Sequence, residues 1–206
     1  MIYIRKFSFY KPSPENPREM PKLSYVDALF RRRLSQITKM TIEAVHGVVQ
    51  GNENSKLVFT SFRGEIARQM KINKGLAEDA DVLPASFSIS VFNTPAAAAT
   101  IALKMKAGYT VVYPAGDNFR SGFLAAAAPL LSGGEKKIIF AYADEKIPEE
   151  LENCKGFSSD IPMAFACVLS SEKDFHGSNE NIAEIDLDSP VLESPESFLE
   201  FLEGKI

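Results

Sequence analysis

Apolar and polar positions along the chain follow two periods, one of about two residues and one of three to four. Short alternating or β-branched runs bounded by proline, glycine or polar clusters are typical of strands. They predict strands at residues 2–10, 56–61, 109–113, 137–143 and 162–170, and an edge strand at 182–187. Apolar residues at helical spacing predict helices at about 26–49, 65–75, 94–106 and 119–131, and a short final helix at 198–202.

Strands that alternate with helices predict an α/β protein with a largely parallel sheet and helices on its faces. The strands at 137–143 and 162–170 are joined by a short connection, so that pair is expected to be antiparallel. We find no internal repeat and no linker rich enough to separate two large domains.

The segment 107–143 is the most informative part of the sequence. It reads as a strand, a tight turn, a helix that is apolar on nearly every face, and a second strand. Several enzyme families place a nucleophile on such a strand–turn–helix elbow. Here the elbow carries Gly116, Asp117 and Asn118, with neither serine nor cysteine. Because an apolar helix avoids water on every side, we expect helix 119–131 to be buried all round.

Composition and charge argue against two classes of protein, those that bind nucleic acid and those that span a membrane. The 206 residues carry a net charge of -4, are 45% hydrophobic and 24% charged, and show no basic stripe interleaved with aromatic residues. We therefore expect no nucleic-acid partner, and no apolar run is long enough to predict a membrane span. Cys154 and Cys167 lack metal-type spacing, which favours a reduced, cytoplasmic setting.

Four short motifs occur in an order that resembles a known family. They are Arg31–Ser35 (RRRLS), Ser61–Glu65 (SFRGE), Phe87–Asn93 (FSISVFN) and Tyr142–Glu145 (YADE). Together they look like the β-ketoacyl synthase-like proteins that consist of the N-terminal domain, called chain-length-factor-like and found with aryl-polyene and flexirubin-type pigment biosynthesis. The resemblance covers roughly residues 1–170.

This resemblance implies half of a thiolase-like fold. It implies a five-stranded mixed sheet, mostly parallel with one antiparallel strand, helices on both faces and a buried central helix. We expect a ketosynthase-like N-terminal domain at 1–172 and a C-terminal appendage at 173–206.

The resemblance also implies which site residues have changed. The acylated cysteine of full ketosynthases opens the central helix, at a position that falls on Asp117, or on Gly116 as the other choice. Neither forms a thioester, and the catalytic histidines of a second half are not expected in this chain. Many relatives have histidine where this sequence has Phe92. No catalytic residue, cofactor or metal site is therefore predicted.

Two readings of the elbow stay open. Asp117 either caps the helix, or contacts an acyl unit as a replacement group. A small-molecule enzyme that uses Asp117 with Arg120 or Asn118 is the corresponding alternative function.

Partner surfaces can also be predicted. Arg31, Arg32 and Arg33 are candidates for docking an acyl carrier protein or an acidic subunit, although a solvated helix start explains such a cluster equally well. Small residues on helix 119–131 and an exposed strand at 109–113 favour pairing with another subunit. The interface candidates are Tyr109, Val111, Tyr113, Ala125 and Ala126. The alternative is that residues 171–206 fold back and cover the helix.

The function predicted by these features is a non-catalytic, chain-length-factor-like subunit of fatty-acid or polyketide-type chain assembly. It would pair with a full-length ketosynthase or with itself. A stand-alone module that binds acyl groups or acyl carrier protein is a further alternative. Cys167 is expected to be a core residue, and Cys154, His46 and His176 to have no catalytic role.

Overall fold

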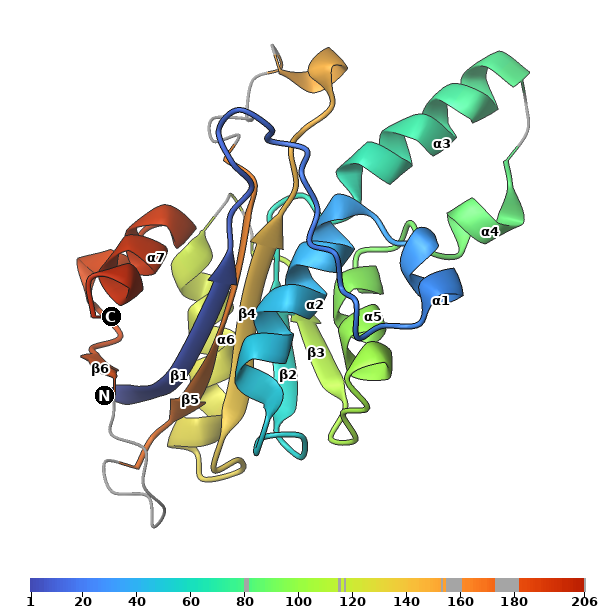
Figure 1. Cartoon of the computed structure of the whole chain (residues 1–206). Helices are drawn as coiled ribbons and strands as arrows, with labels where there is room; N and C mark the ends of the chain where they lie inside the picture. The colour runs from blue at the N-terminus through green and yellow to red at the C-terminus, as the bar shows by residue number, and fades with distance from the viewer. Residues whose placement is uncertain are drawn as a thin grey trace.

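A six-stranded mixed sheet forms the centre of the computed structural model, which describes residues 1–79, 82–114, 116, 118–152, 154, 161–172 and 182–205 (Figure 1). The strand order is β3-β2-β4-β5-β1-β6. The strands are β1 (Ile2–Tyr10), β2 (Lys56–Thr60), β3 (Tyr109–Val112), β4 (Ile138–Asp144), β5 (Met163–Ser170) and β6 (Ala183–Ile185).

The sheet is mixed, as predicted, but of its strand pairs two are parallel and three antiparallel, so both β5 and β6 run against the other strands rather than one strand alone. β2 is parallel to both β3 and β4, whereas β5 is antiparallel to β4, as predicted, and also to β1. β6 adds a sixth, antiparallel strand next to β1, so the expected count of five was too low. The predicted edge strand at 182–187 accounts for the difference.

Helices cover both faces of the sheet (Figure 1). They are α1 (Ala28–Arg32), α2 (Gln36–Val49), α3 (Ile66–Asp79), α4 (Pro84–Phe87), α5 (Thr94–Ala102), α6 (Phe119–Leu131) and α7 (Pro195–Glu203), with 3-10 turns η2 (Glu149–Leu151) and η3 (Pro190–Leu192). The single helix predicted over 26–49 is divided in two, because the Ser35 hydroxyl accepts a hydrogen bond from the Thr38 N–H and caps a new start. The helix predicted over 94–106 ends at Ala102, because Lys104 takes a left-handed φ of 54°.

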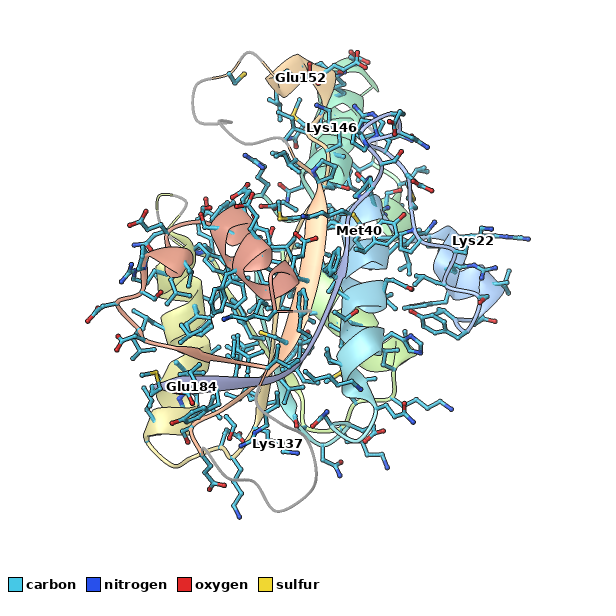
Figure 2. All side chains as sticks on the ribbon, turned by 60° about the vertical axis from the view of Figure 1, so that its left-hand side comes forward. Lys22, Met40, Lys137, Lys146, Glu152 and Glu184 are labelled. Carbon is cyan, nitrogen blue, oxygen red and sulfur yellow. The ribbon has the colours of Figure 1, made fainter. Side chains whose placement is uncertain are left out.

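Alternate residues of each strand serve two separate cores. In β4, Ile139 and Ala141 face α2 and α5, while Ile138 and Phe140 face α6 and α7. Met40, labelled on α2 in Figure 2, belongs to the first core. The continuous apolar run of β4, which is buried along its whole length, therefore reports a sheet that is covered on both sides.

Aromatic rings dominate the second core. The Phe198 ring of α7 lies 5.4 Å from Phe119 and 5.6 Å from Phe123, both on α6, and 5.3 Å from Phe165 on β5. Phe140 of β4 completes the group, and all five side chains are fully buried. The C-terminal residues therefore pack on the same sheet face as α6. The division into a 1–172 domain and a 173–206 appendage stays a prediction, although β6 and α7 share this core with the sheet.

The prediction that α6 is buried on all sides was wrong for this chain. Leu124 and Leu131 are 37% and 49% exposed on its outer face. The inner face packs closely on the sheet, because Gly122 lies so near β2 that a Cβ there would meet the Thr60 hydroxyl oxygen at 2.8 Å. α6 is therefore apolar both on the face that packs on the sheet and on part of the face that is exposed.

Among the described residues, no helix is both long and apolar enough to cross a membrane.

Replacing Phe198 by alanine tests the role of α7 in this core. The change empties a site walled by four other aromatic rings, so we expect the free energy of unfolding to fall by about 3–5 kcal/mol in urea denaturation. The matched control is Phe87→Ala, where the ring is 60% exposed and the expected change is within about 0.5 kcal/mol. Equal effects of the two substitutions would show that α7 is not part of the core.

Candidate functional site

The carboxyl ends of β2, β3 and β4 meet at one edge of the sheet, since these three strands are parallel. Ligand sites of α/β proteins commonly form at such an edge. Residues 61–65 follow β2 there, residues 113, 114, 116 and 118 follow β3, and β4 ends in Asp144 and is followed by Glu145 and Lys146. This edge is the candidate site.

A buried carboxylate organises the turn after β2. The Asp144 Oδ1 accepts hydrogen bonds from the Ser61 hydroxyl at 2.7 Å and the Arg63 N–H at 3.1 Å. Its Oδ2 accepts from the Phe62 N–H at 3.2 Å and from the Tyr142 hydroxyl. Burial raises the pKa of Asp144, and burial together with the Asp144 charge raises the pKa of Tyr142. Because these donors occupy the lone pairs of the carboxylate, the network fits a structural role better than acid–base catalysis.

A second buried carboxylate connects two helices. The Glu145 side chain accepts a hydrogen bond from the Ala67 N–H of α3 at 3.1 Å and a longer one from the Ile37 N–H of α2 at 3.4 Å. Burial raises the pKa of Glu145 to about 7, and the nearby Glu65 charge adds to the effect. Figure 2 shows the following residue, Lys146, at the α3 end of the molecule with Glu152, and their Nζ and Oε1 atoms are 3.0 Å apart.

Glu65 completes this set of buried acids. Its carboxylate accepts from the hydroxyls of Ser35 and Thr38 at 2.7 and 2.5 Å and pairs with the Arg68 guanidinium at 3.1 Å. Sequence reasoning did not identify Glu65, Asp144 and Glu145 as a cluster. The available signal was that SFRGE and YADE place acids directly after two neighbouring strands.

The first turn of α6 is capped and covered. The Asn118 side chain accepts from the Ser121 N–H at 3.2 Å, and Gly116 has a left-handed φ of 63°. Phe119, the first residue of the helix, is fully buried, 5.7 Å from the Tyr142 ring and in contact with the Phe198 ring. Asp117, the predicted counterpart of the nucleophile, lies outside the described residues, so both readings of it stay predictions.

The three consecutive arginines differ in their contacts and exposure. The Arg31 guanidinium donates to the carbonyls of Lys22 and Leu23 at 3.1 and 2.9 Å, which holds the loop that precedes α1. Arg32 and Arg33 are exposed, and the Arg33 carbonyl accepts from Arg68 at 2.8 Å. A docking role for Arg31, Arg32 and Arg33 stays a prediction, and Arg31 already has an internal structural role.

The interface candidates divide between two places. β3 lies at the open edge of the sheet, with β2 as its neighbour. Asn93 donates to the Tyr109 hydroxyl at 3.0 Å, and the Phe92 ring packs edge-on against Tyr113 at 5.4 Å, although Tyr113 remains 65% exposed. On α6, Ala125 is half-buried.

Ala126, by contrast, faces the sheet and is fully buried within the chain. The burial of Ala126 therefore does not support the prediction that it lies in an interface.

The cysteines and histidines of the sequence lie in different environments. Cys167 is buried in β5, and burial raises the pKa of its thiol, whereas Cys154 is exposed. The His46 ring stacks on Tyr25 at 3.8 Å, and His176 lies outside the described residues. Within the described ranges, no group of three or more His, Cys, Asp or Glu is placed to hold a metal ion.

Comparison with solved structures identifies relatives of this fold. A chain of the ketosynthase ApeO in complex with its chain length factor ApeC, from Xenorhabdus doucetiae, matches with a TM-score of 0.71 and 22% identity, over 83% of this chain and 79% of that one. The ishigamide ketosynthase/chain length factor matches with a TM-score of 0.64 and 12% identity, over 86% and 64%. A β-ketoacyl synthase from Burkholderia phymatum STM815 matches with a TM-score of 0.63 and 9% identity, over 84% and 59%.

These likenesses show a ketosynthase-type, thiolase-like fold. The chain spans less than two thirds of the length of the last two proteins. Among curated proteins, none matches the sequence. The family described as beta-ketoacyl synthase, N-terminal domain, matches residues 9–197, which is most of the chain. The protein therefore belongs to the β-ketoacyl synthase N-terminal domain family.

Proposed function

We propose that this protein is a non-catalytic, chain-length-factor-like subunit that pairs with an active ketosynthase in cytoplasmic fatty-acid or polyketide-type chain assembly, such as that of aryl polyenes. The observation that carries the proposal is the start of α6. Full ketosynthases present their nucleophilic cysteine there, whereas here Asn118 caps the helix and the buried Phe119 is surrounded by aromatic rings. The sequence offers no cysteine, and so no thiolate, at this position.

The likeness to solved complexes supports the pairing. A chain from the complex of ApeO with its chain length factor ApeC is of nearly the same length as this one, since the alignment covers similar shares of both. That relative is known as part of a complex between a ketosynthase and a chain length factor. By analogy, we propose that this chain is the subunit without condensing activity.

The open edge of β3 is the surface proposed for pairing. The Gly108 carbonyl accepts a hydrogen bond from the Leu57 N–H, so it faces β2. Because these groups alternate along a strand, the N–H and C=O groups of Tyr109 and Val111 face outward, away from β2. Unpaired groups at an edge favour the addition of a strand from another chain.

Docking of an acyl carrier protein belongs to the same proposal. Its support is the exposure of Arg32 and Arg33, whose side chains are the right charge for an acidic carrier.

A condensation assay tests the absence of catalysis. The purified protein, mixed with acyl carrier protein and malonyl units, is expected to yield no condensation product, because no thiolate is present at the start of α6. Addition of an active ketosynthase to the same mixture is the positive control. Turnover by the protein alone that Asp117→Ala removes would contradict the proposal and favour the small-molecule enzyme.

The pairing surface is tested by Val111→Pro. Proline removes an outward N–H from an edge strand but no hydrogen bond to β2, so the isolated chain is expected to keep its fold. We expect its affinity for a co-expressed ketosynthase to fall by at least about tenfold, measured by native mass spectrometry. Val111→Ala, which keeps the N–H, is the matched control and should retain pairing. Undiminished pairing of the proline variant would place the interface elsewhere.

A further inference from the structure

α3 is attached to the rest of the protein mainly through its first turn. The helix projects beyond the carboxyl ends of β2 and β4 (Figure 1), and none of its described side chains is buried. Apolar burial, the usual source of helix stability, is therefore small for this element. Its orientation must depend on the polar contacts at its base.

The contacts at that base converge on two acids. Glu145 accepts from the Ala67 N–H, and Glu65 pairs with Arg68 while accepting from the α2 hydroxyls of Ser35 and Thr38. Gln69 adds a hydrogen bond to the Ser90 carbonyl at 3.0 Å. Farther along α3, Lys74 pairs with Glu150 at the exposed surface, where an ion pair contributes little.

The segment before α3 allows little adjustment. Gly64 has a left-handed φ of 57°, and a Cβ at this position would lie 2.6 Å from the Phe92 ring. The turn is therefore held on one side by Phe92 and on the other by the hydrogen bonds of Ser61 and Asp144. A change in the position of α3 must occur after Gly64, where Glu145 makes its contact.

We propose that α3 is a hinged arm whose docking onto the sheet edge is controlled by the charge of Glu145. The neutral form of Glu145 lies next to the charged Glu65 without repulsion, while its carbonyl oxygen still accepts from Ala67. The ionised form places two like charges side by side in a buried site, which favours release of the arm.

The groups that face Glu145 support the expectation that its ionisation favours release of α3. Glu65 and Asp144 are acids, and both raise the pKa of Glu145. The Arg68 charge is engaged by Glu65, and the Lys146 side chain by Glu152. From α2 and α3, the N–H groups of Ile37 and Ala67 favour the ionised form, but burial and Glu65 have the larger effect.

Proton linkage gives the expected pH dependence. The pKa of Glu145 is about 7 in the docked state and would return towards its ordinary value of 4.5 in a released arm. The docked state therefore binds more protons between these values, and docking weakens as the pH rises. From about pH 6 to about pH 8, the opening equilibrium is expected to increase about tenfold.

Hydrogen exchange followed by mass spectrometry tests the proposal. After correction for the intrinsic exchange rate, peptides from α3 should lose about tenfold in protection between about pH 6 and about pH 8, while peptides from α5 and β4 do not. Glu145→Gln, which stays neutral, should abolish this difference, and Glu150→Gln, which removes only the surface pair, should preserve it. An α3 protection that does not change with pH, or that changes equally in Glu145→Gln, would overturn the proposal.

A second variant keeps the test decisive if Glu145→Gln does not fold. Glu65→Gln removes the neighbouring charge, so the pKa of Glu145 in the docked state should fall. The loss of α3 protection should then level off at a lower pH, and its midpoint should move to a lower pH. An unshifted midpoint would show that Glu65 and Glu145 are not coupled and would also overturn the proposal.

Discussion

The packing of Phe198 against the first turns of α6 is the contact on which the rest of this structure depends. It joins the last helix to the sheet through Phe119, Phe123 and Phe165. Burial of these rings stabilises the second core and, at the same time, fills the space beside the start of α6. Folding stability and the proposed absence of catalysis therefore have one physical origin.

The same arrangement leaves two apolar or unpaired surfaces on the described part of the chain, which are the surfaces proposed for a partner. α7 covers the sheet beside α6 but not the outer face of α6, where Leu124 and Leu131 remain exposed. β3 keeps an open edge, with Tyr109 and Tyr113 positioned by Asn93 and Phe92. An unpaired edge strand is a hazard for a protein that acts alone. It is useful for a subunit that works in a complex.

Much of the fold could be predicted from the sequence, because local patterns report local structure. Alternation identified the strand at 2–10, and short apolar runs identified those at 56–61, 137–143 and 162–170. The environment of α6 was predicted less well, since composition alone does not show which side of an apolar helix meets the sheet. Phe198 lies almost eighty residues after Phe119, and no local pattern connects the two.

The candidate site, like α6, could be predicted only in part from the sequence. The absence of serine and cysteine at the elbow could be read directly, but the joint attachment of α2 and α3 by Glu65 and Glu145 could not. The two acids are far apart in sequence, and only the parallel arrangement of β2 and β4 brings them together. The edge strand that carries Tyr109 could be predicted from composition, whereas the burial of Ala126 could not, because the rotation of α6 about its axis is not visible in the sequence. A place of these residues in an interface stays a prediction.

The central claim is that this protein works as the non-condensing partner of a ketosynthase. The most direct measurement is a tagged purification from the native host, with the recovered proteins identified and quantified by mass spectrometry. A full-length ketosynthase is expected to be recovered at near-equal amount. Recovery of the protein by itself, as a stable monomer, would contradict it.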